Sequence, residues 1–308
     1  MPLNALYDLP APAKLNSFLH VVGRRADGYH LLQSAFVLID WADRLSFECR
    51  NDGLLQRHDL GPRLPADDLC LRAARALQQA SGCALGVDIH IDKQLPWGAG
   101  MGGGSSDAAT TLLALNRLWG LGWPRERLLA MAQTLGADVP FFIGGHNAFV
   151  EGIGERLKPI PWPQQGYAVI KPAAAIATAD IFGDPALVRD TPAAILLGSF
   201  EETAENALGR NDGNVVKAVS VADLVQGWGH NDLEPPARRH CPEVAQASQR
   251  LEALFGNSRM TGSGSAVFAR VGTNAPPEAT FPAESLPPGW VGRMCRSLEQ
   301  HPLVGWAS

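Results

Sequence analysis

The spacing of apolar residues changes several times along the first third of the chain, and each change predicts a different element. Residues 14–22 and 35–47 cluster or alternate apolar side chains like β-strands, and the polar stretch 23–30 joins them. Between residues 66 and 82, apolar side chains recur at helical spacing, and two aspartates at the start of this segment can cap a helix. We therefore expect a pair of strands followed by an amphipathic helix.

A further strand, a loop and two helices are predicted next. Residues 87–91 alternate apolar and polar side chains as a half-buried strand does, and a glycine-rich turn leads from them into a helical pattern over 108–113. A second helix is expected to begin near Pro124 and to end at Gly136. Asp138 should thus lie just past the end of a helix.

A proline-rich connection at 158–163 divides the pattern, because prolines sustain neither a helix nor a central strand. We therefore expect two domains, 1–157 and 158–308. In the second domain the pattern predicts a helix over 242–255, a turn at 261–265 with an apolar strand over 266–271, and a proline-rich loop over 275–289.

Size and charge restrict the partners of the chain. Its 308 residues, 46% of them hydrophobic and 19% charged, suffice for one large core or two moderate ones. With 26 basic against 31 acidic side chains, the formal net charge of −5 provides no broad cationic field for nucleic acid or anionic lipid. We expect neither as a partner, so any phosphate site must be local.

The cysteines and the N-terminal residues favour a cytoplasmic location. Residues 1–13 lack a basic patch followed by an apolar stretch, and no run approaches the ~18 apolar residues of a membrane span. The cysteines form no C-x-x-C pair and no histidines show zinc spacing, so we expect free thiols and no structural metal. The cysteines are Cys49, Cys70, Cys83, Cys241 and Cys295.

The stretch from Pro96 to Ser106 has the composition of a phosphate-binding loop. Its five glycines let backbone amides approach an anion, and the helix that follows adds unpaired amides and the positive end of its dipole. Ser105 and Ser106 add hydroxyl donors. The alternative is a flexible turn between strand and helix, which so many glycines and serines at a helix start disfavour.

This loop matches neither of two better-known phosphate motifs. It is not a P-loop, because Asp107 follows the serines and the Gly-Lys-Ser/Thr ending is missing. It fits G-x-G-x-x-G formally, but Glu126, at the required distance, falls early in a predicted helix instead of at a strand end. A dinucleotide-binding dehydrogenase is therefore disfavoured.

Three segments together resemble the GHMP kinases. Pro12-Ala-Lys-Leu-Asn16 is similar to their first motif, the glycine-rich stretch to their second, and Thr261-Gly-Ser-Gly-Ser265 to their third. The resemblance implies an α+β, two-lobed GHMP kinase fold, with an N-terminal ATP-binding lobe, a C-terminal α/β lobe and the active site in the cleft between them. It also implies a small-molecule kinase that uses ATP and Mg²⁺.

Further segments narrow the resemblance to those members that phosphorylate a hydroxyl of a cytidine diphosphate alcohol on a route to isoprenoid precursors. The most specific is Arg25-Ala-Asp-Gly-Tyr-His30. The family often has Asp-Asn-Leu where this chain has Asp67-Asp68-Leu69, so no adenine contact is assigned to Asp68. Residues 183–230 match weakly and receive no role. Other similar segments are Leu135-Gly-Ala-Asp-Val-Pro140, Glu151-Gly-Ile-Gly-Glu155 and Asn231-Asp-Leu-Glu234.

The resemblance assigns the catalytic roles to Lys14 and Asp138. Asp138 would accept the proton of the attacking hydroxyl, and Lys14 would orient Asp138 and stabilise developing charge. Taken alone, Asp138 fits better as a turn residue that bonds its own backbone, and Lys14 as an exposed strand lysine.

Contacts to the two substrates are also implied by the resemblance. His30 would hydrogen-bond the base while Tyr29 and Phe182 stack on it, although all three could be ordinary turn and core residues. The expected ATP contacts are Lys93, Pro96, Trp97, Gly98, Ala99, Gly100, Met101, Gly102, Gly103, Gly104, Ser105 and Ser106. The expected acceptor contacts are Asn16, Tyr29, His30, Thr178, Phe182, Gly262 and Ser263.

Two alternatives stay open from sequence. One is a GHMP kinase for mevalonate, homoserine or a sugar, which would not need a cytosine pocket. The other is a nucleotide sensor on the same fold without catalysis, which would be expected to lack Lys14 or Asp138. We expect a monomer or a weak homodimer that binds small molecules.

Overall fold

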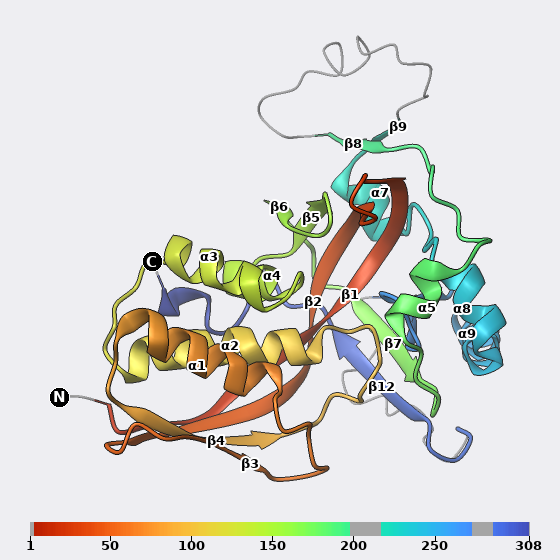
Figure 1. The fold of residues 1–308 in the computed structure, drawn as a ribbon. Coiled ribbons are helices and arrows are strands. Elements are labelled where there is room, and N and C mark those ends of the chain that lie inside the picture. Colours follow the sequence, from red (N-terminus) through yellow and green to blue (C-terminus); the bar gives the residue numbers. More distant parts are fainter. Residues whose placement is uncertain (1–2, 198–216, 273–285, 308) are drawn as a thin grey trace.

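The computed structural model describes residues 3–197, 217–272 and 286–307 and has two lobes, each built on a sheet (Figure 1). Most of the loop expected over 275–289 lies outside these residues. The first elements in chain order are β1 (Ala5–Arg24), β2 (His30–Arg50), β3 (Leu55–Asp59), α1 (Leu69–Ser81), β4 (Gly86–Asp92), α2 (Gly103–Leu118), α3 (Arg125–Leu135), α4 (Val139–Gly144), β5 (Ala148–Glu151) and β6 (Arg156–Pro159). They are followed by β7 (Gly166–Lys171), α5 (Thr178–Gly183), β8 (Ala194–Leu196), β9 (Lys217–Val219), α7 (Val221–Gln226), α8 (Glu234–His240), α9 (Pro242–Phe255), β10 (Arg259–Met260), β11 (Val267–Val271), β12 (Val291–Arg296) and the 3-10 turn η2 (Val304–Trp306).

The first sheet is organised around the long antiparallel hairpin of β1 and β2. Its order is β3-β4-β2-β5-β6, with β1 paired to β2, and the helices α1 to α4 pack on it (Figure 1). The predicted amphipathic helix is α1, which begins where the Asp68 side chain accepts the Leu71 amide and ends at left-handed Gly82. The strand predictions are confirmed, although both strands are longer than expected.

Asp138 lies at a junction that the sequence pattern predicts only in part. The helix α3 ends at Leu135, before Gly136, as expected. A short helix, α4, then begins directly after Asp138, with Pro140 in its first turn, where a missing N–H costs nothing. Asp138 occupies the N-cap position, but its side chain makes no capping hydrogen bond. The carboxylate is therefore not used by the helix it precedes.

The second lobe packs helices on a sheet of order β10-β11-β7-β12 (Figure 1). Its helix α9 has the predicted bounds, because Pro242 suits a first turn and Gly256 adopts the left-handed conformation that ends a helix. Leu251 from α9 and Ile170 from β7 belong to the core between helices and sheet. The predicted turn and strand after it are also confirmed, since β11 follows the turn.

The chain crosses between the lobes twice. The strand β6 pairs with β5, so the expected boundary between residues 157 and 158 falls inside a strand of the first sheet. Near the end of the chain, the Leu298 amide donates to the Leu38 carbonyl at 2.8 Å, and the Arg125 guanidinium donates to the Ala307 carbonyl at 2.6 Å. We propose that the first lobe comprises residues 3–159 with 298–307, and the second the described residues between 166 and 297.

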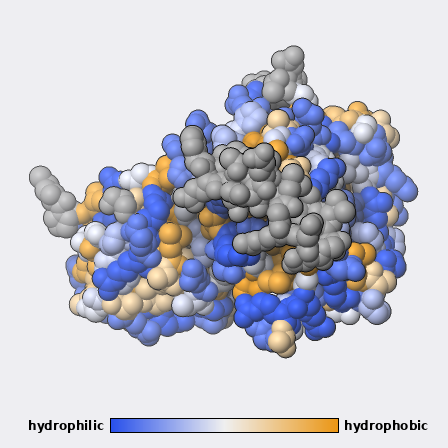
Figure 2. Space-filling model, turned by 90° about the horizontal axis from the view of Figure 1, so that it is seen from above, coloured by the Kyte–Doolittle hydropathy of each residue, from blue (hydrophilic) through white to orange (hydrophobic). Residues whose placement is uncertain are grey.

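The surface agrees with the composition of the chain. On the face shown in Figure 2, hydrophilic residues are interspersed with hydrophobic ones. Among the described residues, no helix combines the length and the apolar character needed to cross a membrane.

Asn147 provides a test of the second crossing between the lobes, at which residues 298–307 return to the first lobe. Its Oδ1 accepts the Leu38 amide and its Nδ2 donates to the Leu298 carbonyl, both at 2.8 Å, and the side chain is fully buried. Replacing it (Asn147→Ala) should lower the free energy of unfolding by about 1–3 kcal/mol, because two buried backbone groups lose their partner. Urea denaturation measures the change. The control Gln164→Ala, at an exposed position, should stay within about 0.5 kcal/mol of the original chain, and an equal loss in both variants would contradict the interpretation.

Candidate active site

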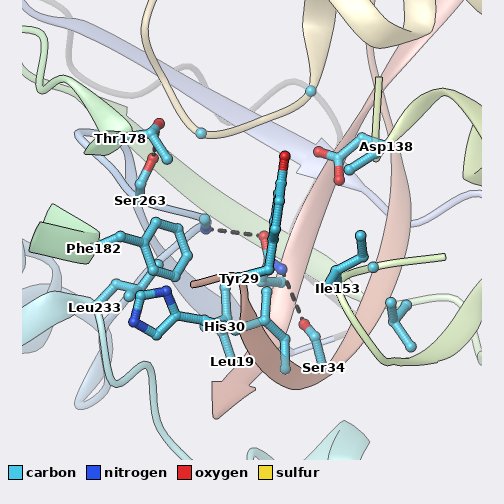
Figure 3. Close-up of a pocket in the computed structure, with 18 of the residues that line it drawn as sticks. Leu19, Tyr29, His30, Ser34, Asp138, Ile153, Thr178, Phe182, Leu233 and Ser263 are labelled. Atoms are coloured by element: carbon cyan, nitrogen blue, oxygen red, sulfur yellow. Dashed lines mark hydrogen bonds between the residues drawn. The ribbon is translucent and has the colours of Figure 1, made fainter. Parts of the chain in front are cut away.

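Two cavities share the glycine-rich loop between β4 and α2. The first, of about 840 Å³, contains Lys14, Asp138 and the expected acceptor residues (Figure 3). The second, of about 440 Å³, contains all the expected nucleotide residues except Ser106 and is called the nucleotide cavity below. Both are lined by the loop residues Gly100, Gly102 and Ser105. A group held by the loop can therefore be reached from both cavities.

The loop presents a helix start to the nucleotide cavity. The helix α2 begins at Gly103, and its N-cap, Gly102, has φ +71°, a conformation that favours glycine. The amides of this first turn have no partners within the helix, so they can bind an anion. Ser106 differs from the other expected contacts: it is fully buried, lines neither cavity, and its hydroxyl has no hydrogen-bond partner among the described residues.

The glycine-rich loop is held against the turn at 261–265 from the second lobe, which is similar to the third GHMP motif. A Cβ added to Gly100 would lie 2.3 Å from the Thr261 carbonyl oxygen, and one added to Gly262 would lie 2.7 Å from the Gly100 carbonyl oxygen. The Ser265 amide also donates to the Gly98 carbonyl at 3.1 Å. The two turns thus pack backbone against backbone, which places both lobes at one site.

Lys93 lines the nucleotide cavity, and its ammonium already has two carboxylate partners. Its ammonium pairs with Asp107 at 2.6 Å and with Asp43, in a largely buried cluster that borders the nucleotide cavity. Burial by itself would lower the pKa of Lys93, but the charges of Asp107 and Asp43 raise it. Burial raises the pKa of Asp107 well above its ordinary value, against the opposing charge of Lys93.

Two other residues that line the nucleotide cavity, Asp68 and Trp97, differ in how available their side chains are to a ligand. Asp68 caps α1 and pairs with Arg57 at 2.9 Å, so its carboxylate already has two structural partners. Trp97, in contrast, leaves 68% of its surface exposed at the cavity. Its ring is therefore the more available surface for a flat base.

Lys14 and Asp138 meet in the larger cavity. The Lys14 ammonium lies 3.6 Å from a carboxylate oxygen of Asp138, and its side chain is only 4% exposed, which excludes the reading as an exposed strand lysine. The Lys14 amide donates to the Met101 carbonyl at 3.0 Å, which fixes β1 to the glycine-rich loop. Burial lowers the pKa of Lys14, and the Asp138 carboxylate opposes this shift. Asp138 is 30% exposed and faces the cavity (Figure 3).

Asn16 connects the parts of the site. Its Oδ1 accepts hydrogen bonds from the Lys14 ammonium at 2.6 Å, the Gly262 amide at 2.9 Å and the Thr261 hydroxyl at 3.2 Å. Its Nδ2 donates to Ser34 at 2.9 Å. Asn16 lines the cavity as expected, but most of its polar capacity is used inside the protein. Sequence reasoning gave no role to Thr261 or Ser34, whose importance arises from contacts between distant segments.

The acceptor end of the cavity gathers the other expected residues (Figure 3). Thr178 and Ser263 share a hydrogen bond of 2.7 Å between their hydroxyls. The rings of His30 and Phe182 stack with centroids 5.0 Å apart, and Tyr29 is 61% exposed beside them, so it is not a core aromatic. Gly262 also lines this cavity.

Two residues of this region were missed from sequence. Arg189 donates from Nε to His30 Nε2 at 3.1 Å, although it lies in the stretch 183–230 to which no role was assigned. Asn231 donates to the Met260 and Gly262 carbonyls and so holds the turn of the second lobe. The segment Asn231-Asp-Leu-Glu234 was a usable signal for Asn231, whereas no local pattern marks Arg189.

Comparison with known proteins agrees with this geometry. Residues 68–146 match the family model "GHMP kinases N terminal domain", and residues 216–280 match "GHMP kinases C terminal". These matches define the class of protein as GHMP kinase.

Relatives that align over nearly the whole chain identify one family within the GHMP kinases. The chain is 61% identical over 308 residues to the 4-diphosphocytidyl-2-C-methyl-D-erythritol kinase of Methylibium petroleiphilum, covering all of both chains, and 54% identical to that of Variovorax paradoxus, covering 99% of this chain and all of the relative. A crystal structure of 4-(cytidine 5'-diphospho)-2C-methyl-D-erythritol kinase superposes with a TM-score of 0.72 at 36% identity, covering 94% of this chain and 98% of the other. The chain belongs to the family of 4-diphosphocytidyl-2-C-methyl-D-erythritol kinases.

The contact between the two turns can be tested at Gly100. The change Gly100→Ala should weaken ATP binding and reduce activity, because its Cβ would push the loop away from the Thr261 carbonyl. The matched control is Gly120→Ala, since Gly120 has a similar φ of +66° but no atom within 4 Å of an added Cβ. The control should lose only about 1–2 kcal/mol of stability, the cost of a left-handed backbone with a side chain. Isothermal calorimetry with ATP and urea denaturation measure both effects, and unchanged ATP affinity in Gly100→Ala would show that the contact is dispensable.

Proposed function

We propose that this enzyme transfers the γ-phosphoryl group of ATP to the 2-hydroxyl of 4-diphosphocytidyl-2-C-methyl-D-erythritol, a step toward isoprenoid precursors. The observation that carries the proposal is the position of the Lys14–Asp138 pair in a cavity that reaches the glycine-rich loop on one side and Tyr29, His30 and Phe182 on the other. A phosphoryl donor at the loop and an acceptor at the aromatic end would meet at the pair. The relatives at 54% and 61% identity carry the name of this activity.

The transfer requires one proton acceptor and one cation at the reacting atoms. Asp138 takes the proton of the acceptor hydroxyl, and the hydroxyl oxygen forms a bond to the γ-phosphorus. The bond from that phosphorus to the β–γ bridging oxygen breaks, which releases ADP. Lys14 stabilises the charge on the transferred group and holds Asp138 in place. Because Asp138 has no capping role in α4, its carboxylate is available for this task.

ATP would occupy the smaller cavity with its phosphates at the start of α2. The amides of the glycine-rich loop and the helix dipole favour its negative charge, so no cluster of cationic side chains is required. Trp97 would lie against the adenine, since its exposed ring borders this cavity.

Phosphoryl transfer in this class implies Mg²⁺ with the nucleotide, and the residues present fit such an ion. No group of three or more acidic, histidine or cysteine side chains for a metal occurs in the described part of the chain. However, Oδ1 of Asp107 is buried at the start of α2, beside the nucleotide cavity, without a hydrogen-bond partner among the described residues. Hard oxygen ligands of this kind, together with phosphates, suit Mg²⁺. The ion would supply charge neutralisation on the phosphates, and Asp107, which lines the nucleotide cavity, would hold it.

For location and assembly we keep the predictions made from the sequence. All five cysteines are free thiols in the structure, which is consistent with a reducing compartment, and we place the enzyme in the cytoplasm. We propose that it acts as a monomer or a weak homodimer.

The acceptor can be tested directly by ADP release from the purified protein with magnesium-ATP. We expect release with 4-diphosphocytidyl-2-C-methyl-D-erythritol and none above background with mevalonate, homoserine or galactose. Release with one of the other alcohols would retain the kinase and reject the cytidine pocket. Tight ATP binding without release from any of the four would indicate a nucleotide sensor.

The role of Asp138 predicts a selective loss of turnover. The change Asp138→Asn should lower kcat by at least about a hundredfold, the usual contribution of a general base, while ATP affinity stays near its original value. Steady-state kinetics and calorimetry measure the two quantities. The control Asp180→Asn removes an exposed carboxylate that lines neither cavity and should leave kcat unchanged. Near-normal turnover in Asp138→Asn would exclude it as the base.

A further inference from the structure

Arg189 lies next to the end of the larger cavity that is formed by His30 and Phe182, and it is anchored to the end of α5 and the loop that follows. Its Nη1 donates to the Leu187 carbonyl at 3.0 Å, and its Nη2 donates to the carbonyls of Phe182 at 3.0 Å and Asp184 at 2.9 Å. These three bonds fix the orientation of the guanidinium plane. The remaining Nε–H points at the His30 ring and donates to Nε2 at 3.1 Å.

This bond determines which nitrogen of His30 carries the proton. A guanidinium is always protonated and has no acceptor, so Nε2 must accept and therefore carries no hydrogen. In a neutral imidazole the proton then resides on Nδ1. The neutral form is favoured as well, because partial burial and the charges of Arg189 and Arg24 lower the pKa of His30.

The edge of the His30 ring that carries Nδ1 is available to a ligand. His30 lines the cavity beside Tyr29 (Figure 3), and its Nδ1 has no hydrogen-bond partner within the described part of the chain. Stacking on Phe182 at 5.0 Å restricts rotation of the ring, and Arg189 binds the Phe182 carbonyl as well. One arginine therefore fixes both the tautomer of His30 and the segment on which its ring rests.

We infer that Arg189 is a positioning residue that makes His30 a hydrogen-bond donor from Nδ1, and that this donor selects cytosine over uracil. The inference rests on the proposed function, in which His30 contacts the base. Cytosine presents a bare N3 that accepts a hydrogen bond, whereas uracil carries a hydrogen on N3. A fixed Nδ1–H thus pairs with cytosine and meets the N3–H of uracil donor against donor, which leaves both groups unsatisfied.

Three variants separate this role from simple support of the loop. Arg189→Met removes the donor at similar length, and Arg189→Lys retains a cation that can donate to Nε2. The matched control is Arg239→Met, because Arg239 holds the same loop through Asp184 at 2.9 Å without contact to His30. For each chain, kcat and KM are measured with the cytidine substrate and with its uridine analogue. Long-range ¹H–¹⁵N NMR of the free protein reports the tautomer of His30.

The original chain should show Nδ1–H and prefer the cytidine substrate by about a hundredfold in kcat/KM, a typical range for one mismatched buried hydrogen bond. In Arg189→Met the proton should move to Nε2 in a large fraction of molecules. KM for the cytidine substrate should then rise with little change in kcat, and the preference should fall at least tenfold. Arg189→Lys should restore part of the preference, and Arg239→Met should keep all of it.

Failure of the inference and of the proposed function are distinguishable. An original chain that uses both nucleotides equally would refute the placement of cytosine at His30, and the inference with it. If the original chain discriminates but Arg189→Met retains both the Nδ1–H tautomer and the full preference, the inference alone is overturned. An equal fall of the preference in Arg239→Met would likewise overturn it, because loosening of the loop would then suffice.

Discussion

Gly100 and Gly262 bring turns from the two lobes so close together that neither position has room for a side chain. The rest of the site depends on this contact. Asn16 can bind Lys14 and the Gly262 amide at once because the second-lobe turn lies against the loop, and the Lys14 amide is bonded to that loop. The position of the Lys14 ammonium beside Asp138 is therefore set by backbone packing between lobes as much as by the side chains themselves.

In the proposed function, the site binds phosphates with few cationic side chains, although the chain as a whole is acidic. Among the described residues that line the two cavities, the lysines and arginines are Lys14, Arg24 and Lys93. Lys93 is already matched by Asp43 and Asp107, so its charge is largely neutralised locally. The amides at the start of α2 supply most of the remaining attraction. Such a field is short in range, which suits selection of a bound anion more than long-range steering.

Features encoded by neighbouring residues were predictable, whereas features that join distant segments were not. The helices α1 and α9 and the glycine-rich loop follow from spacing and from capping residues. The helix α4 was missed because six residues with an apolar start show no helical period. The pairing of Lys93 with Asp43 crosses fifty positions, and Arg189 reaches His30 across 159. Resemblance to a family supplied Lys14 and Asp138, which the bare pattern left open.

The return of residues 298–307 to the first lobe has a consequence for synthesis on the ribosome. Arg125, Asn147 and Leu38 all find partners in this segment, so the buried polar groups of the first lobe are incomplete until it has been made. Domains at the start of a chain commonly fold while translation continues. Here the first lobe cannot complete these contacts until the second lobe has been synthesised, so its final closure comes late in folding.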